Sequence, residues 1–226
     1  MINLAINGGA MNSSSKPTIP RWLPDPLPQG AEYVLTIKEY IRTIRDDGFI
    51  HIKEAAVLCA DAYAEGKRII YPFYGHSERK GIAEAREGRP GFLTYVKDAE
   101  VSEGDAFITI HAASAIEAKE KGAKVIGISN AFLPSKPGNY LTIDRKAAES
   151  DPGDFYTGPF LEDHCDVFID DQVPYTVGII AFDGLKSHFG NGVGIMEGYV
   201  FWTLTAAIAD HLLERGITFD VLDHSD

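Results

Sequence analysis

Residues 104–129, GDAFITIHAASAIEAKEKGAKVIGIS, contain two apolar runs separated by a short stretch of helical character. The runs 105–110 and 124–129 have the length of buried strands. Residues 115–121 between them favour a helix, and Gly122 is suited to end it. Apolar strands alternating with a helix predict a parallel sheet covered on both faces.

Further apolar runs lie on both sides of this segment. Residues 68–74 (RIIYPFY) and 92–96 precede it, and 166–170 (DVFID) follow it. Together they predict a five-stranded parallel sheet. Because crossovers between parallel strands are right-handed, the carboxyl ends of the strands meet at one edge, where open α/β sheets bind ligands.

Helical periodicity is present before and after the strands. Tyr33, Ile37, Ile41 and Ile44 share one face of a helix that begins near Glu32. Further helices are expected at 51–65, with Gly48 as a C-cap before it, at 77–87, and at 195–215.

These elements predict a single domain over residues 31–226, an α/β/α sandwich of three layers. Residues 1–30 are rich in glycine, serine and proline and predict an irregular N-terminal arm. A domain of this size buries enough surface to fold without disulfides or a structural metal.

Charge and hydropathy argue against several functional classes. The formal net charge of −12 and the absence of a basic run argue against binding of nucleic acids or anionic membranes. The apolar stretch 194–213 contains Glu197 and Asp210, so it predicts a buried helix rather than a membrane span. The N-terminus lacks the basic and apolar regions of a signal peptide, which favours a cytoplasmic protein.

The two cysteines, Cys59 and Cys165, are expected to be buried free thiols. The chain has no CxxC pair and no cysteine–histidine cluster with zinc spacing. Residues 163–165 combine aspartate, histidine and cysteine, but neighbouring side chains in an extended chain point in opposite directions. We therefore expect no metal and no cofactor, and a reducing compartment.

Three stretches, in this order, resemble the sugar-isomerase (SIS) family, in particular its phosphosugar-isomerase-like bacterial members. They are 66–77, which ends in Gly-His-Ser, the run 103–128, and 166–170 followed by the long helix from Met196. The most specific match is the second, EGDAFITI followed by EAKEKGAKVIGI. The resemblance covers about residues 50–215.

The resemblance implies a five-stranded parallel sheet between helices, and homodimers or homotetramers with sites near subunit interfaces. It also implies aldose–ketose isomerisation of phosphosugars, or phosphosugar recognition by regulators. One departure concerns the loop after the second strand, where the family has Ser-x-Ser-Gly-x-Thr/Ser to hold phosphate. Here residues 111–115 read HAASA, so the usual phosphate loop is missing.

The candidate substrate-binding residues follow the ends of the predicted strands. Backbone N–H groups of Gly75, His76 and Ser77, with the Ser77 hydroxyl, could bind an anion at a helix start. The alternative is that Ser77 is only an N-cap.

Further candidates follow the second and third strands of this series. His111 could hydrogen-bond a sugar hydroxyl or move a proton. The alternative is that it caps the short helix or bonds a loop carbonyl. Ser114 follows the same strand. Ser129, Asn130 and Lys136 follow the third strand. Lys136 could neutralise a phosphate, or be an ordinary exposed lysine.

His188 and Glu197 flank the start of the last helix. Isomerisation through an enediol needs a base that moves a proton between C1 and C2 and an acid that serves the oxygens. A buried carboxylate and an imidazole suit these tasks. We expect Glu197 to be the base and His188 the acid or ring-opening group. The alternative is that Glu197 pairs with an arginine or caps a helix.

The leading hypothesis is therefore an aldose–ketose isomerase that acts on a sugar phosphate. The alternative is a non-catalytic phosphosugar-binding or regulatory module, which the missing serine-rich loop favours. A third possibility is a scaffolding oligomer that has kept the fold and lost the site, because fold alone does not decide function.

Overall fold

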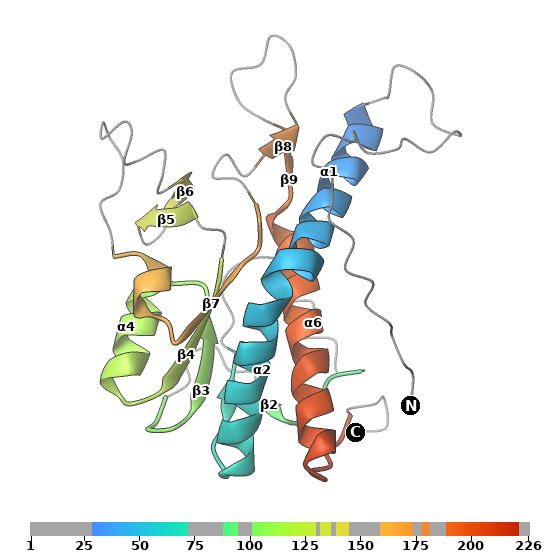
Figure 1. Cartoon of the computed structure of the whole chain (residues 1–226). Helices are drawn as coiled ribbons and strands as arrows, with labels where there is room; N and C mark the ends of the chain where they lie inside the picture. The colour runs from blue at the N-terminus through green and yellow to red at the C-terminus, as the bar shows by residue number, and fades with distance from the viewer. Residues whose placement is uncertain are drawn as a thin grey trace.

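The computed structural model (Figure 1) describes the chain in segments, and the arm expected at 1–30 lies almost wholly outside them. The described segments are 29–71, 88–94, 101–129, 132–136, 139–144, 159–173, 178–180 and 189–221. The helix expected at 77–87 also lies outside the described residues.

A five-stranded sheet with the order β2-β1-β3-β4-β7 forms the centre of the molecule, and all of its strand pairs are parallel. The strands are β1 (Ile69–Ile70), β2 (Leu93–Thr94), β3 (Ala106–Thr109), β4 (Lys124–Ser129) and β7 (Val167–Asp170). Each lies within an apolar run of the sequence. The prediction of an α/β fold with a five-stranded parallel sheet is confirmed.

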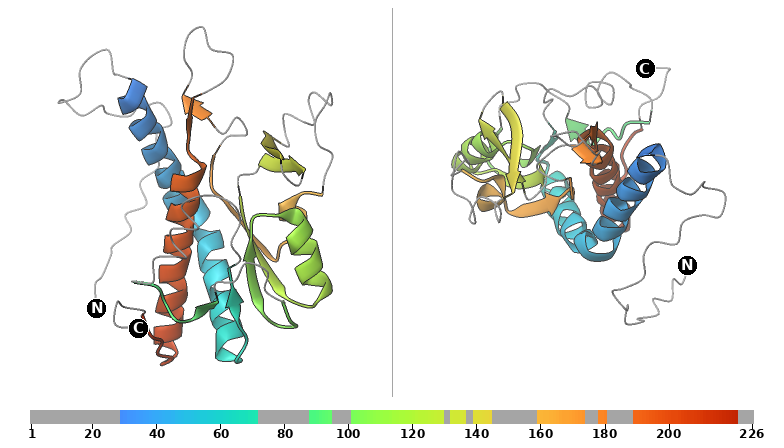
Figure 2. Two further views of the ribbon diagram at one scale, coloured as in Figure 1. Left: turned by 180° about the vertical axis from the view of Figure 1, so that it is seen from behind. Right: turned by 90° about the horizontal axis from the view of Figure 1, so that it is seen from above.

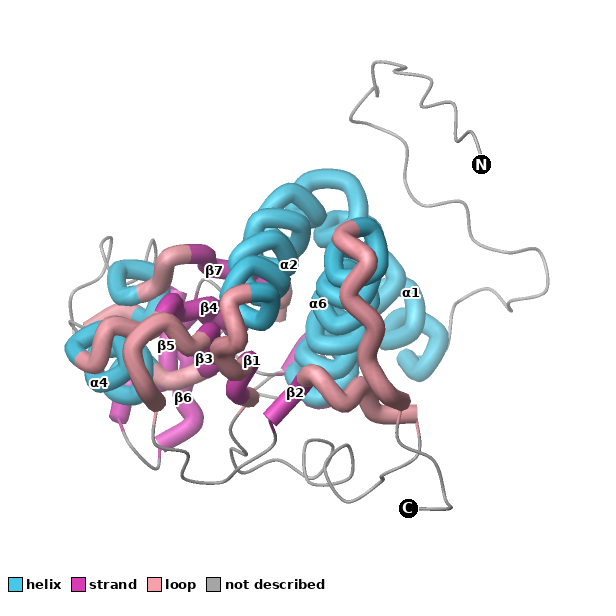
Figure 3. Tube along the Cα trace, turned by 90° about the horizontal axis from the view of Figure 1, so that it is seen from below, coloured by secondary structure: helices cyan, strands magenta, loops and turns pink. Residues whose placement is uncertain are grey.

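Successive residues of each strand enter two different cores, one on each face of the sheet. Ile69, Ile108 and Ile126 belong to the core beneath α2 and α6. Ile70 and Phe107 pack with α4 on the other face. Figure 3, seen from below, shows α2 and α6 on one side of the strands and α4 (Ala112–Glu120) on the other. The sheet is therefore the middle of three layers.

The first two expected helices form one uninterrupted helical run, so the prediction that Gly48 ends a helix is wrong. Helix α1 (Gln29–Thr43) passes through a π-helical turn (Ile44–Gly48) directly into α2 (Phe49–Ala64). Gly48 has a φ of −88° and a ψ of −12°, a right-handed helical conformation rather than the left-handed one of a glycine cap. The extra residue of a π-turn is accommodated without a break.

The last helix, α6 (Val193–Glu214), agrees with the expected 195–215 and lies alongside α2 in Figures 1 and 2. Helix α4 begins at Ala112, three residues before the expected Ala115. Because Ala112, Ala113 and Ser114 all tolerate a first helical turn, the helix starts as soon as β3 ends.

Two short antiparallel hairpins occupy stretches that the sequence suggested were loops. The first pairs β5 (Phe132–Lys136) with β6 (Asn139–Asp144), and the second pairs β8 (Gly178–Ile180) with β9 (Phe189–Asn191). Both rise above the carboxyl ends of the sheet strands in Figure 1. Among the described residues, no helix has the length and apolar character to cross a membrane.

Candidate functional site

The carboxyl edge of the sheet is the place where strands end and two helices begin. Strands β3, β4 and β7 run in one direction, so Thr109, Ser129 and Asp170 end them at the same edge. Helix α4 starts there directly after β3, and α6 starts there after the hairpin strand β9 (Figure 1). The helices approach this edge from opposite faces of the sheet.

Polar groups after β4 and β7 form a tight turn at this edge. The carbonyl of Ser129 accepts the N–H of Asp171 at 2.9 Å, and both residues are buried. Carboxylate oxygens of Asp170 and Asp171 accept the N–H groups of Gln172 and Val173, at 2.8 and 3.0 Å. Gln172 has a φ of 66°, a left-handed conformation uncommon for a residue other than glycine.

His111 lies between β3 and α4 in an extended conformation, with its N–H donated to the hydroxyl oxygen of buried Thr109 at 3.1 Å. It occupies the N-cap position of α4, but its side chain makes no capping hydrogen bond. The prediction that His111 could cap this helix is therefore wrong, whereas the alternative that it bonds a loop carbonyl stays a prediction. Ser114, half-buried in the first turn of α4, adds a hydroxyl at the same edge.

The start of α6 is fixed by contacts with α1. The side-chain oxygen of Asn191 accepts the N–H of Val193 at 2.8 Å, and the Tyr33 hydroxyl donates to the Asn191 carbonyl at 2.7 Å. Gly190 has a φ of 81°, and a Cβ there would lie 2.9 Å from the Tyr33 ring. Glycine is therefore required at the point where α1 crosses the entry to α6.

Glu197 lies in the second turn of α6 with only 8% of its surface exposed. Phe201, one turn later, packs against Tyr71 with the two rings tilted by 44° and 4.6 Å between their centroids, and Tyr71 directly follows β1. Because residues four apart share a face of a helix, Glu197 faces the region just beyond the end of β1. A buried carboxylate is costly to keep in a fold, which makes it a candidate for a specific task.

The structure thus places His111, Ser114, Ser129 and Glu197 at one edge of the sheet. Gly75, His76, Ser77, Asn130 and His188 lie outside the described residues. The backbone of Lys136 lies in β5, and its side chain falls outside the described part. Sequence reasoning missed Tyr71 and Asp171, although the Asp170–Asp171 pair at the end of an apolar run was a signal for the latter.

The opposite edge, where the strands begin, carries two acidic residues of a different kind. Asp105, 3% exposed before β3, accepts hydrogen bonds from the Arg68 side chain at 2.6 Å, the Arg68 N–H at 3.0 Å and the Ser102 N–H at 2.9 Å. Burial acts to raise the pKa of Asp105, but these hydrogen bonds outweigh it and hold the pKa below its ordinary value.

Asp166, just before β7, also accepts hydrogen bonds from a cationic side chain and a backbone N–H. Its carboxylate accepts hydrogen bonds from the Lys119 ammonium at 2.6 Å and the N–H of Val125 at 2.7 Å, which joins α4, β4 and β7. Burial again acts to raise the pKa of Asp166, and these two hydrogen bonds outweigh it, so the pKa is lowered. Both carboxylates are thus ionised anchors of the fold.

The two thiols are unsuited to nucleophilic chemistry. Cys59 is fully buried, and burial raises its pKa. Burial, with the charge of Asp166 adding to it, raises the pKa of Cys165 to about 12. Thiolates are the reactive form of cysteine, so both side chains are inert at neutral pH.

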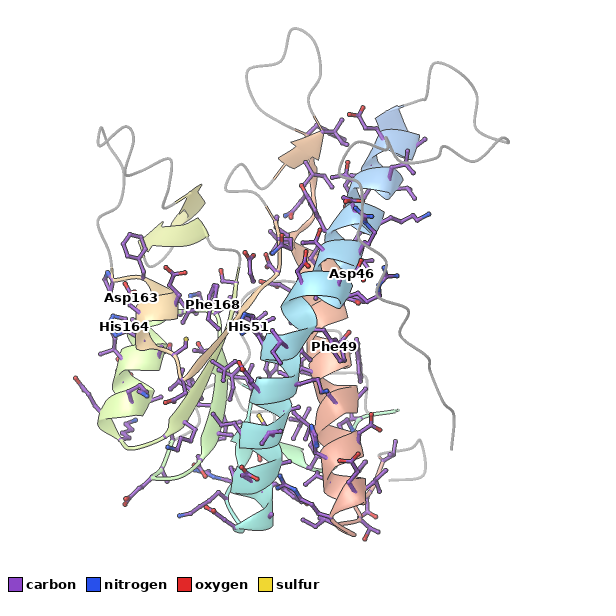
Figure 4. The ribbon with its side chains drawn as sticks, in the orientation of Figure 1. Asp46, Phe49, His51, Asp163, His164 and Phe168 are labelled. Carbon is purple, nitrogen blue, oxygen red and sulfur yellow. The ribbon has the colours of Figure 1, made fainter. Side chains whose placement is uncertain are left out.

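No group of three histidine, cysteine or acidic side chains able to hold a metal occurs within the described segments. Asp163 and His164 lie on a 3₁₀ turn (Leu161–His164) beside α4, away from Asp46 and Phe49 on the α1–α2 run (Figure 4). The described residues of the site, His111, Ser114, Ser129 and Glu197, carry acid–base and hydrogen-bonding groups.

Comparison with known proteins gives one distant relative. No family model matches the chain. A UPF0309 protein of Streptomyces coelicolor is 23% identical over an alignment 218 positions long, and this alignment spans 79% of this chain and 81% of that protein. The similarity extends over most of both chains, and the relative's name specifies no substrate or activity.

Proposed function

We propose that this protein is a sugar-phosphate isomerase of the SIS type, which interconverts an aldose and a ketose phosphate at the carboxyl edge of its sheet. The observation that carries the proposal is Glu197, a carboxylate 8% exposed near the start of α6, one helical turn before Phe201, which packs against Tyr71 at the end of β1. Both cysteines of the chain are free thiols, one buried and one partly buried. Free thiols fit a cytoplasmic enzyme.

Glu197 is the proposed base. Isomerisation through an enediol moves one proton from the carbon that bears the hydroxyl to the neighbouring carbonyl carbon. A carboxylate in a water-poor position holds that proton between the two transfers, while a second group moves a proton between the substrate oxygens. His111 and His188 are the proposed candidates for that second role.

The phosphate requires local donors, because the net charge of −12 repels an anion at long range. The first turn of α4 offers N–H groups at a helix start, together with the hydroxyl of Ser114. Lys136 and the Gly75–Ser77 turn remain proposed contributors. The substrate would then lie between α4 and α6, across the ends of β3 and β1.

Incubation with a panel of aldose and ketose phosphates in D2O, followed by NMR, tests the proposal. An enediol mechanism replaces the transferred hydrogen with deuterium even when the net conversion is small. We expect exchange with one sugar phosphate and its loss in Glu197→Gln. Glu214→Gln, an exposed glutamate at the far end of the same helix, is the matched control. Absence of exchange with every sugar, in folded protein, would refute an isomerase.

A non-catalytic phosphosugar-binding module is the second candidate. It is favoured by the first turn of α4, where Ala112 and Ala113 stand in place of the hydroxyl residues of the SIS phosphate loop. This function predicts thermal stabilisation by a sugar phosphate that grows with ligand concentration, without deuterium exchange. Equal stabilisation of wild type and Glu197→Gln would favour it over the enzyme.

A further inference from the structure

Gln172 is the only residue other than glycine with a positive φ among the described residues. Its φ of 66° lies in the left-handed region, where a side chain crowds the backbone. Glycine adopts this conformation freely, and asparagine and aspartate tolerate it better than glutamine does. A turn that needed only this backbone shape would therefore be more stable with glycine.

The turn around Gln172 holds this conformation from both sides. The carboxylate of Asp170 accepts the Gln172 N–H at 2.8 Å, and that of Asp171 accepts the Val173 N–H at 3.0 Å. Asp171 also donates its own N–H at 2.9 Å to the carbonyl of Ser129, a residue of the candidate site. Residues that their surroundings keep in an unfavourable backbone region are concentrated at binding and active sites.

The side chain of Gln172 is the one that this turn leaves accessible. Asp171 is 2% exposed and Val173 is fully buried, whereas Gln172 between them is partly exposed. Within the described segments, the Gln172 carboxamide makes no hydrogen bond. An amide with unused donors and an unused acceptor therefore lies at the carboxyl edge, directly after β7.

A carboxamide at this position suits hydroxyl groups better than phosphate. Its NH2 group donates and its oxygen accepts, and each hydroxyl of a sugar can do both. The carboxylates of Asp170 and Asp171 lie in the same turn and disfavour a phosphate there. The first turn of α4, after β3, remains the better place for the phosphate. Because β4 separates β3 from β7, the ends of β3 and β7 lie about 10 Å apart, so one sugar phosphate can reach both.

We propose, on the basis of the sugar-phosphate function proposed above, that Gln172 binds hydroxyl groups of the sugar at the end of β7 while the phosphate lies by α4. A site built to hydrogen-bond a hydroxyl rejects ligands that lack it, because its polar groups are then left unpaired. Gln172 is thus a specificity residue and takes no part in proton transfer. The left-handed backbone places its amide at the edge.

Isothermal titration calorimetry of the full-length chain with hexose and pentose phosphates tests this role. Gln172→Ala removes the amide and keeps the left-handed conformation, whereas Gln172→Gly removes both the amide and the strain. We expect both variants to bind the sugar phosphate about tenfold more weakly, which corresponds to one lost hydrogen bond. Inorganic phosphate, the second probe, should bind the wild type and both variants alike. Glu120→Ala, exposed at the end of α4, is the matched control and should bind the sugar phosphate like the wild type.

Urea denaturation of the same variants separates binding from folding. Gln172→Gly should unfold at a higher urea concentration than Gln172→Ala, because glycine adopts a positive φ without strain. Undiminished sugar-phosphate binding in both variants, an equal loss of inorganic phosphate binding, or a glycine variant less stable than the alanine variant would overturn this role of Gln172 alone. A wild type that binds no sugar phosphate would overturn both this role and the proposed function. A wild type that binds without deuterium exchange would overturn the isomerase and leave the role of Gln172 standing.

Discussion

The two edges of the parallel sheet use acidic residues in opposite ways. At the edge where strands begin, Asp105 and Asp166 each accept one side-chain cation and at least one backbone N–H, and both have lowered pKa values. At the carboxyl edge, Asp170 and Asp171 accept the N–H groups of a tight turn. Glu197, at the same edge, belongs to helix α6 and not to a strand or to the turn after one.

If the proposed function holds, the two edges divide the fold into a part that stabilises it and a part that carries its chemistry. The anchors at the first edge join neighbouring elements, since Arg68 precedes β1 and Lys119 lies in α4. Substitution there should change the stability of the whole sheet. Glu197 lies near the start of α6 and outside the sheet. Under the proposed function, its substitution should change what the protein does while leaving the sheet intact.

The largest stability effect should follow Asp105→Ala. This change leaves the Arg68 N–H and the Ser102 N–H without their acceptor at the start of β3. Loss of a buried acceptor should cost about 2–3 kcal/mol in the free energy of unfolding, measured by urea denaturation. Asp47→Ala, at an exposed position in the π-turn, should cost less than about 0.5 kcal/mol. Equal costs would contradict the anchor role.

Gly127→Ala tests the packing of β4 against Cys165 and Leu161, which lie before β7. A Cβ there would collide with Sγ of Cys165 and lie 3.0 Å from Cγ of Leu161. Overpacking of this kind costs about 1–3 kcal/mol. Adding Cys165→Ala removes the closest obstacle, so the double variant should be more stable than the sum of the two single changes predicts. Simple additivity in thermal denaturation would show that Cys165 does not set this constraint.

Asp166→Asn should have a smaller effect, about 1 kcal/mol, because the carboxylate is 26% exposed and its partner Lys119 is 42% exposed. The asparagine can still accept the Val125 N–H, which limits the loss. The free energies of unfolding of Asp166→Asn and Asp105→Ala, both measured by urea denaturation, show which of the two carboxylates stabilises the fold more. A larger loss for Asp166→Asn would reverse the expected order.

Acid should weaken both anchors together. A carboxyl group whose pKa is lowered in the folded state stabilises the fold above its unfolded pKa of about 4, and that stabilisation is lost as pH falls through the folded value. We therefore expect the free energy of unfolding to fall with pH below about 4. The fall should be shallower in Asp105→Asn, which lacks one such group. A wild-type slope in that variant would contradict the assignment.

The sequence predicted the sheet because its strands are apolar on both faces. Runs such as 105–110 and 124–129 are apolar, only six residues long and close to glycines, so a buried strand is the structure that they favour. It did not predict the helical continuation through Gly48, since the packing of Ile44, fully buried against the core, outweighs the local preference of glycine to end a helix.

The sequence analysis also did not predict the two hairpins, although a turn-forming dipeptide indicated the first of them. Residues 132–136 and 139–144 flank the dipeptide Pro137–Gly138, which is typical of a turn between two strands. For the site, the order of the strands was enough to place His111 and Ser129 at one edge, and Glu197 was placed there by its position near the start of the last helix. The burial of Asp171 and the contact of Tyr71 with Phe201 depend on tertiary packing, which no local pattern encodes.

The most direct test compares two variants, Glu197→Gln and Asp105→Asn, at equal concentrations of folded protein. The quantity measured is the rate at which each variant exchanges deuterium into sugar phosphates. It asks whether the carboxyl edge carries the chemistry while the opposite edge carries the stability. We expect Glu197→Gln to keep the wild-type melting temperature and to lose exchange by at least about a hundredfold. We expect Asp105→Asn to melt earlier and to exchange at the wild-type rate per folded molecule. Undiminished exchange by Glu197→Gln would contradict the assignment of Glu197 as the base.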